Sequence, residues 1–261
     1  MDPETRFLEV AGRRLEYAWH GPGPEAAPTL VFLHEGLGCV RLWRDFPARL
    51  AAATGLGAFV YSRWGYGLSD PVALPRSVRY MHDEALEVLP QVLAAAGIGD
   101  SVLVGHSDGA SIALIWAGGT SAPGLRGLIV EAAHVFCEDV SVQSIAAAAR
   151  AYETGDLKDR LARYHGSNTE CAFRGWNEPW LDPEFRHWNL EGYLPAIRVP
   201  TLVIQGEDDE YGTGRQVEAI AAGIGDRAEV LMLPDCGHSP HRDRPDRVLA
   251  AMADFVRRLG L

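Results

Sequence analysis

This 261-residue sequence has few cysteines, no long apolar segment and no excess of basic residues. The four cysteines are scattered without a Cys-x-x-Cys spacing, which argues against disulfides and a zinc site and favours a reducing compartment. No apolar run approaches the roughly 18 residues that cross a bilayer. Residues 1–5 lack the basic and apolar regions of a signal peptide. We therefore expect a cytoplasmic protein with no membrane segment.

The net charge of −11 argues against some classes of partner, and the glycine and histidine spacings argue against a dinucleotide cofactor and a metal ion. No cluster of Lys and Arg is present to neutralise phosphates, so neither nucleic acid nor an anionic membrane surface is an expected partner. Gly36-x-Gly38 lacks the third glycine of a dinucleotide-binding turn. The pair His238-x-x-His241 has no third ligand nearby to complete a metal site. We expect no cofactor and no metal.

Strand and helix patterns alternate along most of the chain, which indicates βαβ units and a parallel sheet flanked by helices. A hairpin is expected at 6–20, and the segment 133–199 contains helical patterns at 144–152 and 157–164 but no convincing strand. The other predicted strands are 29–33, 58–61, 101–104, 125–131, 200–204 and 228–233, and the other predicted helices are 41–53, 77–96, 110–116 and 244–259.

A Gly-x-Ser-x-Gly sequence at residues 105–109 stands between a predicted strand and a predicted helix. This is the pattern of a nucleophile elbow, a sharp turn that leaves one hydroxyl exposed at its tip. Small flanking residues are needed because the turn is strained and brings strand and helix close together. The helix N-terminus beneath Ser107 favours negative charge. The alternative is an ordinary loop in which Ser107 only caps the helix.

A serine nucleophile needs a histidine base and an acid that orients it, and both residue types follow later strands. The strand that ends at Gln205 leads to four carboxylates at 207–210, and the strand that ends near Leu233 leads to His238. Since the carboxyl ends of parallel strands meet at one edge of the sheet, we expect these groups to converge on Ser107.

Two choices remain within these segments. Gly237 frees the backbone for a close approach and so favours His238 over His241 as the base. Spacing alone leaves Asp208 and Asp209 equally suited as the acid. Of the other histidines, His106 is expected to shape the elbow, and His20, His82, His165 and His187 are expected at the surface or in caps.

Together these motifs resemble the α/β-hydrolase superfamily, and the match extends from about residue 6 to the end of the chain. The elbow at 105–109, the acid segment 206–209 and the pair 237–238 carry the resemblance. Residues 34–38, His-Glu-Gly-Leu-Gly, are similar to the oxyanion loop of that superfamily, and residues 62–69 are similar to its Arg-x-x-Gly-x-Ser loop. Esterases, proline iminopeptidases and ring-cleavage hydrolases of this kind share the pattern.

The resemblance implies an α/β-hydrolase fold, with a mostly parallel eight-stranded sheet flanked by helices and a helical cap inserted late in the sheet. Residues 1–132 and 200–261 would then form the core, and residues 133–199 the cap. In similar proteins the acid stands three residues after the glycine that ends its strand, which points to Asp209.

The resemblance also implies roles for individual residues. Ser107 would attack a carbonyl, His238 would take its proton and Asp209 would orient the imidazole. The N–H groups of Asp108 and Gly36, with Leu37 as the alternative to Gly36, would form the oxyanion hole.

Two carboxylates depart from the commonest form of the family. Glu35 replaces the first glycine after His34, and it is expected either to pair with an arginine or to bind a cationic or hydrogen-bonding group of the substrate. Asp108 is expected to be structural, favoured by the helix dipole. The arginines considered for Glu35 are Arg41, Arg44 and Arg63.

Aromatic residues are frequent in the segment 133–199, where they can form its core or line a pocket. The residues expected to contact substrate are Glu35, Leu37, Trp64, Tyr66, Trp176 and Trp180.

The sequence thus predicts a serine hydrolase that cleaves a small ester, lactone or thioester through an acyl-enzyme. The alternatives are an aminopeptidase of the proline-iminopeptidase kind with Glu35 or Glu131 holding an amine, a carbon–carbon bond hydrolase, and a non-catalytic ligand receptor. A haloalkane dehalogenase is disfavoured because it needs a carboxylate where this chain has Ser107. The expected partner is a small-molecule substrate, and a homodimer stays open as the assembly.

Overall fold

The computed structural model describes residues 6–261 and places eight strands in one sheet, in the spatial order β1-β2-β4-β3-β5-β6-β7-β8. Residues 1–5, for which no signal-peptide features are predicted, lie outside the described residues. The strands are β1 (Arg6–Val10), β2 (Arg13–His20), β3 (Thr29–Leu33), β4 (Gly57–Tyr61), β5 (Ser101–His106), β6 (Leu125–Glu131), β7 (Thr201–Gly206) and β8 (Ala228–Leu233).

Strands β3 to β8 run parallel, while β1 and β2 form an antiparallel hairpin that joins the sheet through β4. Strands β3, β4, β5 and β7 are buried along their whole length, as expected for parallel strands covered on both faces. The predicted hairpin and the predicted mostly parallel eight-stranded sheet are both confirmed.

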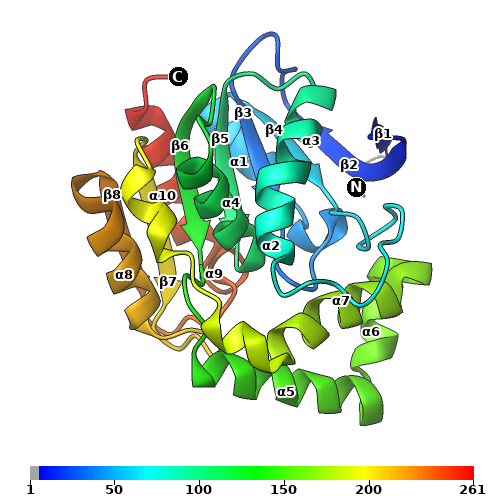
Figure 1. The fold of residues 1–261 in the computed structure, drawn as a ribbon. Coiled ribbons are helices and arrows are strands. Elements are labelled where there is room, and N and C mark those ends of the chain that lie inside the picture. The colour runs from blue at the N-terminus through cyan, green and yellow to red at the C-terminus, as the bar shows by residue number, and fades with distance from the viewer. Residues whose placement is uncertain (1–5) are drawn as a thin grey trace.

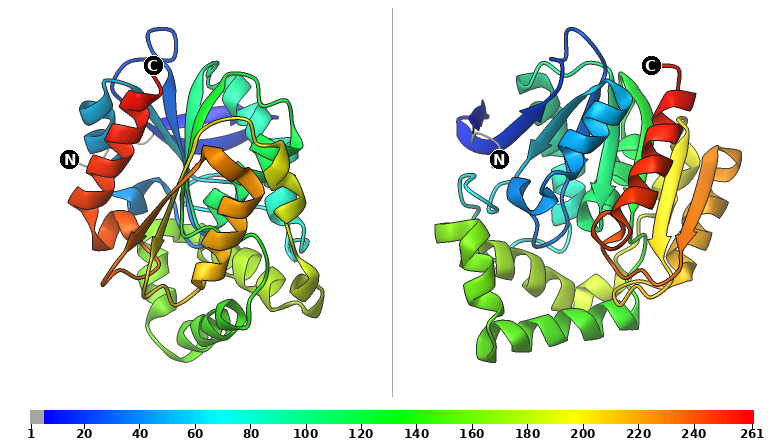
Figure 2. Two further views of the ribbon diagram at one scale, coloured as in Figure 1. Left: turned by 90° about the vertical axis from the view of Figure 1, so that its left-hand side faces the viewer. Right: turned by 180° about the vertical axis from the view of Figure 1, so that it is seen from behind.

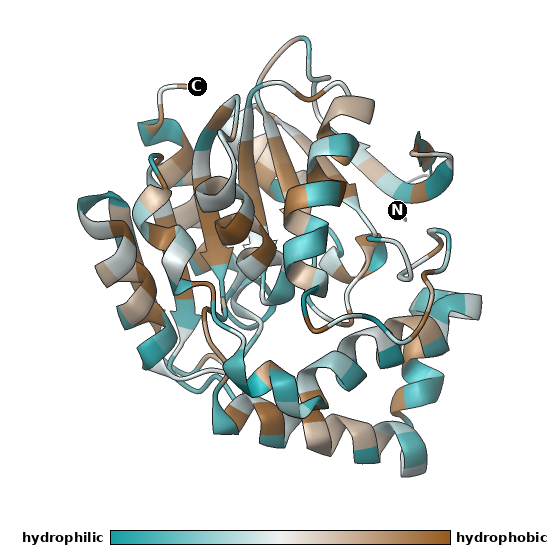
Figure 3. Ribbon diagram, viewed as in Figure 1, coloured by the Kyte–Doolittle hydropathy of each residue, from teal (hydrophilic) through white to brown (hydrophobic). Residues whose placement is uncertain are grey.

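Helices cover both faces of this sheet (Figures 1 and 2). Successive strand side chains point to opposite faces. Leu103 of β5 therefore belongs to the core beneath α4 (Asp108–Gly119) with Ile112, whereas Val104 belongs to the core beneath α1 (Phe46–Thr54) and α10 (Pro245–Arg258) with Leu50 and Met252. Figure 3 shows the most apolar residues concentrated along the strands.

Among the described residues, no helix combines the length and the apolar character that a membrane span requires. The helices are α1 (Phe46–Thr54), α2 (Tyr80–Asp83), α3 (Leu89–Ala95), α4 (Asp108–Gly119), α5 (Asp139–Thr154), α6 (Leu157–His165), α7 (Thr169–Leu181), α8 (Gly214–Ile224), α9 (Pro240–Asp243) and α10 (Pro245–Arg258).

Two predicted helices are interrupted. The helix expected over 77–96 consists of α2, a π-helical turn at Glu84–Val88 and α3. Pro90 has no N–H to donate to the preceding turn, so the hydrogen-bond ladder is broken at this point. The helix expected over 41–53 begins as a 3₁₀ turn and is broken at Arg44, whose φ is +54°; α1 starts only after it.

The segment 133–199, which we call the helical insert, connects β6 to β7. It contains α5, α6, α7 and three 3₁₀ segments, Gly166–Asn168, Pro183–His187 and Glu191–Ala196. In Figures 1 and 2 its helices α5, α6 and α7 lie across the carboxyl ends of the strands. Part of its aromatic content is internal packing, since the rings of Phe185 and Trp188 stack with their centroids 5.2 Å apart.

The start of α4 lies directly against the end of β3. A Cβ atom added at Gly109 would overlap the carbonyl group of Leu33. Glycine at this position therefore lets the helix that follows Ser107 approach the sheet closely.

Replacing Gly109 by Ala should destabilise the fold by about 1–3 kcal/mol, because backbone must move to admit the methyl group. The measurement is urea unfolding followed by circular dichroism. The matched control is Gly192→Ala, where an added Cβ meets no atom within 4 Å, and its free energy of unfolding should change by less than about 0.5 kcal/mol. Equal effects of the two substitutions would contradict the close packing of α4 on β3.

Candidate active site

Ser107 occupies the turn between β5 and α4 with φ 53° and ψ −118°. A positive φ is strained for a residue with a side chain. The turn is held by the N–H groups of Ala110 and Ser111, which donate to the Ser107 carbonyl at 2.9 and 3.0 Å. The Ser107 N–H donates to the Glu131 carbonyl at 2.9 Å. The strand–turn–helix geometry is that predicted for residues 105–109.

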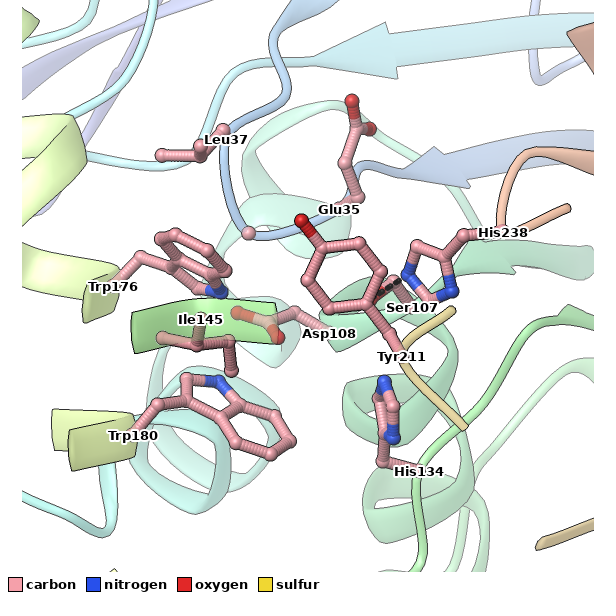
Figure 4. A pocket seen from close by; sticks show the side chains of 11 residues that line it. Glu35, Leu37, Ser107, Asp108, His134, Ile145, Trp176, Trp180, Tyr211 and His238 are labelled. Carbon is pink, nitrogen blue, oxygen red and sulfur yellow. Dashed lines mark hydrogen bonds between the residues drawn. The ribbon is translucent and has the colours of Figure 1, made fainter. Parts of the chain in front are cut away.

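His238, on the loop after β8, lies between Ser107 and Asp209. Its Nε2 is 2.9 Å from the Ser107 Oγ, and its Nδ1 is 2.8 and 2.9 Å from the two carboxylate oxygens of Asp209. Figure 4 shows the imidazole directed at Ser107 across this hydrogen bond. With Nδ1 donating to the carboxylate, Nε2 is the acceptor that a serine hydroxyl requires.

The carboxylate of Asp209 is almost fully buried, with a side-chain exposure of 1%. It accepts hydrogen bonds from Gln205 Nε2 at 2.7 Å and from the N–H groups of Tyr211 and Gly212 at 2.8 and 3.2 Å. Burial by itself would raise the pKa of Asp209, but the hydrogen bond and charge of His238, together with the Tyr211 N–H, hold it below the ordinary value. The acid is thus ionised in the range where histidine titrates.

The two residues that the sequence offered as alternatives have other partners. Asp208 is exposed, and its N–H donates to the Cys236 carbonyl at 2.9 Å. His241 Nδ1 is 2.8 Å from Glu131 Oε2 in a fully buried contact. Neither residue therefore competes for the position beside Ser107.

A cavity of about 100 Å³ opens beside Ser107. Its walls come from the loop after β3, the elbow, the helical insert and the loops after β7 and β8, and Figure 4 shows Trp176, Trp180 and Tyr211 around Ser107 and Asp108. Most of the wall is apolar and aromatic. The lining residues are Glu35, Gly36, Leu37, Ser107, Asp108, His134, Ile145, Trp176, Trp180, Tyr211 and His238.

Both residues predicted for the oxyanion hole line this cavity. Asp108 is the first residue of α4, and N–H groups in a first helical turn have no acceptor within the helix. Gly36 faces the helical insert so closely that an added Cβ would overlap the indole of Trp176. Glycine at 36 therefore allows Trp176 to close one side of the cavity.

Trp64 and Tyr66, which the sequence analysis placed against the substrate, do not line the cavity. Tyr66 is 1% exposed and packs on the ring of His34, with centroids 4.9 Å apart. Trp64 is 7% exposed and lies under the guanidinium of Arg13 at 4.2 Å. These two aromatic residues support the loop behind the site instead of forming its wall.

A family profile described as the Alpha/beta hydrolase family matches residues 30–251. The chain belongs to the alpha/beta hydrolase family. The fold class expected from the sequence is therefore confirmed by the comparison as well as by the sheet topology, and the chain is an enzyme of this family.

Individual relatives of this alpha/beta hydrolase carry different activities in their names. The chain is 29% identical over 263 residues to 2-succinyl-6-hydroxy-2,4-cyclohexadiene-1-carboxylate synthase of Enterobacter sp. (strain 638), covering 90% of this chain and 94% of that protein. The proline iminopeptidase of Mycobacterium smegmatis superimposes with a TM-score of 0.71 at 20% identity, over 98% of each chain. The esterase RhEst1 from Rhodococcus sp. ECU1013 gives a TM-score of 0.72 at 18% identity, over 98% of this chain and 99% of that one. The two structures share the fold of this hydrolase.

In this hydrolase Glu35 pairs with a histidine, and not with any of the arginines considered from the sequence. Arg63 donates to the carbonyl oxygens of His34 and Glu35 at 2.6 and 3.1 Å. The Glu35 carboxylate instead lies 3.5 Å from Nδ1 of His106. His106 Nε2 in turn is 2.7 Å from the carbonyl oxygen of His238. The pair thus connects the oxyanion loop to the loop that carries the imidazole.

This contact changes the protonation of both partners. Burial alone would lower the pKa of His106, but the Glu35 carboxylate and, more weakly, Glu131 and the His238 carbonyl raise it to about 9. Burial tends to raise the pKa of Glu35, but His106 outweighs this and holds it well below the ordinary value. His106 is therefore an imidazolium at neutral pH, with its Nε2 hydrogen on the His238 carbonyl and its Nδ1 facing the Glu35 carboxylate as an ion pair.

Asp108 was expected only to stabilise the N-terminus of its helix. Its side chain is in addition fully buried and lines the cavity. Its Oδ2 accepts a hydrogen bond from Tyr80 Oη at 2.5 Å and lies 3.8 Å from the Arg63 guanidinium. Burial raises the pKa of Asp108, while Arg63 and Tyr80 oppose that rise. The residue is structural toward Tyr80 and Arg63, and it also forms part of the pocket wall.

Three lining residues were missed by the sequence analysis: His134, Ile145 and Tyr211. The ring of Tyr211 lies 4.7 Å from that of His238 between centroids. Burial, with a smaller contribution from the charge of His238, lowers the pKa of His134 to about 3, so this ring is neutral. Only the position of His134 and Tyr211 shortly after the ends of β6 and β7 could have indicated them.

Two histidines expected at the surface are buried. His165 accepts the Gly67 N–H at 2.9 Å and lies 3.0 Å from the Leu37 carbonyl, so it ties two loops beside the site together. His82 is 6% exposed and packs on the ring of Tyr193. Their partners come from distant segments, which local sequence position does not reveal.

Within residues 6–261, no group of three His, Cys, Asp or Glu side chains is arranged to hold a metal ion.

The Glu35–His106 pair predicts a pH-dependent contribution to stability. Because the pKa of His106 is raised from 6.5 to about 9 on folding, its contribution is complete below about pH 6.5 and is lost as the pH rises through 9. Glu35→Gln should therefore lower the free energy of unfolding by about 1–2 kcal/mol near pH 6, and the difference from wild type should shrink by pH 9.5.

Urea unfolding of both proteins at the two pH values measures this difference. The exposed Glu207→Gln serves as the control and should show no such pH dependence. A Glu35→Gln effect that grows toward alkaline pH would contradict the assigned charges.

Proposed function

We propose that this alpha/beta hydrolase is a serine hydrolase that cleaves a small ester, lactone or thioester through an acyl-enzyme on Ser107. The observation that carries the proposal is the 2.9 Å contact between Ser107 Oγ and His238 Nε2 at the wall of a cavity, with Asp209 on the other side of the ring. This is the arrangement that activates a hydroxyl as a nucleophile.

In the acylation step His238 Nε2 takes the hydroxyl proton of Ser107 as Oγ bonds to the substrate carbonyl carbon. The N–H groups of Asp108 and Gly36, with Leu37 as the alternative, hold the negative oxygen. Collapse of the tetrahedral intermediate breaks the carbon–oxygen or carbon–sulfur bond, and the leaving group departs with the proton from His238. Water then attacks the acyl group by the same route and releases the acid.

The size and chemistry of the cavity favour a short acyl group. At about 10–15 Å³ for each water-sized group, a cavity of about 100 Å³ holds roughly seven to ten non-hydrogen atoms. Leu37, Ile145, Trp176 and Trp180 supply an apolar wall that excludes water from the reacting centre.

The alternative activities find less support in these contacts. For an aminopeptidase, the two carboxylates that could hold an amine are already paired, Glu35 with His106 and Glu131 with His241. For the synthase activity named in the Enterobacter relative, the product is a carboxylate; the described cavity wall has no Lys or Arg to bind one. A carbon–carbon bond hydrolase and a receptor remain outcomes of the test below.

Ser107→Ala should reduce the turnover of p-nitrophenyl acetate and butyrate by about 10³-fold or more, because the nucleophile is lost. Multiple turnovers at a constant rate by the wild type would distinguish an enzyme from a receptor. The matched control is Ser121→Ala, an exposed serine after α4, which should retain wild-type rates.

Hydrolysis that persists in Ser107→Ala would contradict the proposal. Wild-type cleavage of amino-acid p-nitroanilides faster than of esters would favour a peptidase, and cleavage of vinylogous 1,5-diketones alone would favour a carbon–carbon bond hydrolase.

A further inference from the structure

The cavity wall contains one buried carboxylate oxygen without a donor. Oδ2 of Asp108 is engaged by Tyr80 and faces Arg63, whereas Oδ1 is buried and has no hydrogen-bond partner among the described residues. Figure 4 shows this carboxylate between the indoles of Trp176 and Trp180. A buried acceptor without a partner is costly, and native proteins leave few of them.

Two neighbouring donors, Trp180 and Tyr80, do not supply a hydrogen to Oδ1. The indole Nε1 of Trp180 lies near the same carboxylate, but its hydrogen goes to Tyr80 Oη at 3.0 Å. Tyr80 gives its own hydrogen to Asp108 Oδ2. Tyr80 and Trp180 therefore leave no hydrogen for Oδ1, and a group held in the cavity can supply one.

The neighbouring arginines do not supply a hydrogen to Oδ1 either. Arg63 lies 3.8 Å from Oδ2, and its Nη1 and Nη2 donate to the carbonyls of His34 and Glu35. Arg76 pairs with Glu84 through Nη2 at 2.9 Å. Nε of Arg63 and Nη1 of Arg76 have no hydrogen-bond partner among the described residues, so neither of them donates to Oδ1. The faces of the two indoles beside Asp108 also suit a positively charged group.

The position of Asp108 limits where the donor can be. The backbone N–H proposed to hold the substrate carbonyl oxygen and the free carboxylate oxygen belong to the same residue. A group that reaches Oδ1 while the carbonyl sits at Ser107 must therefore be attached within the first carbons of the acyl chain.

We propose that Asp108 Oδ1 accepts a hydrogen bond from an ammonium or hydroxyl group next to the scissile carbonyl, and that the enzyme selects 2-amino or 2-hydroxy acyl esters. The inference rests on the proposed function, since it names the substrate class of that same site. Asp108 then has two separate roles, with its N–H on the oxyanion and its side chain on the acyl substituent.

The test compares three benzyl esters with the same leaving group, those of L-alanine, L-lactate and propionate. An ammonium group activates an ester by itself, so the readout is the ratio of kcat/KM for each substituted ester to that for propionate, in wild type and in Asp108→Asn. The Asn variant keeps the shape of the side chain and one acceptor oxygen while it removes the charge.

The alanine-to-propionate ratio should fall by about tenfold or more in Asp108→Asn, the amount a charge-assisted hydrogen bond supplies. If only the alanine-to-propionate ratio falls, the natural donor is an ammonium group. If the lactate-to-propionate ratio falls as well, the site accepts both an ammonium and a hydroxyl group. Asp139→Asn removes an exposed carboxylate, 82% exposed in its side chain, and should leave both ratios unchanged.

Equal loss of activity toward all three esters, or unchanged ratios, would overturn the selectivity role. Should Asp108→Asn fail to fold, inhibition of the wild type by 1-aminoethylboronic acid and by ethylboronic acid takes its place. At least tenfold tighter inhibition by the amino compound is expected, and equal inhibition would overturn the inference. If the wild type hydrolyses none of the esters in a Ser107-dependent way, the proposed function itself fails, which is a distinct result.

Discussion

His238 has four polar groups, and each of them has its own partner. Its Nδ1 contacts Asp209, its Nε2 contacts Ser107, its N–H donates to Glu210 Oε2 at 3.2 Å, and its carbonyl accepts from His106 at 2.7 Å. A histidine held from all four sides has one position and one ring orientation. The nucleophile and the acid contact this residue directly, and the oxyanion loop is connected to it through the Glu35–His106 pair.

The parallel sheet brings these residues together at one edge, and pairing of charges lowers the free-energy cost of burying them there. Strands β5, β7 and β8 belong to the parallel part of one sheet, with β6 between β5 and β7. Their carboxyl ends therefore bring Ser107, Asp209 and His238 to one edge. Ionised groups at this edge are costly to bury unless they are paired. Two carboxylate–histidine pairs beside the site, Glu35 with His106 and Glu131 with His241, meet this requirement.

The sequence could predict the features that depend on local pattern and chain order. The Gly-x-Ser-x-Gly turn and the polar residues after each strand indicated Ser107, His238 and an acid at 208 or 209, because strand ends are positioned by the sheet. The choice of Asp209 came from the resemblance to the family. It could not predict partners set by side-chain direction across distant loops. Glu35 was therefore matched to arginines instead of His106, and Trp64 and Tyr66 were placed in the pocket although they face the protein interior. The sequence does contain a signal for the interruption of the helix over 77–96, because Pro90 has no N–H to donate to the preceding turn.

The central claim is that Ser107 becomes covalently acylated with His238 as the base. Rapid-quench mass spectrometry of the intact enzyme with p-nitrophenyl butyrate tests it most directly. The account predicts a transient mass increase of one butyryl group, stoichiometric with a burst of p-nitrophenolate, that maps to the peptide containing Ser107 and fails to form on the same timescale in His238→Gln. A butyryl group on any other residue, or steady hydrolysis with no covalent adduct, would contradict the account.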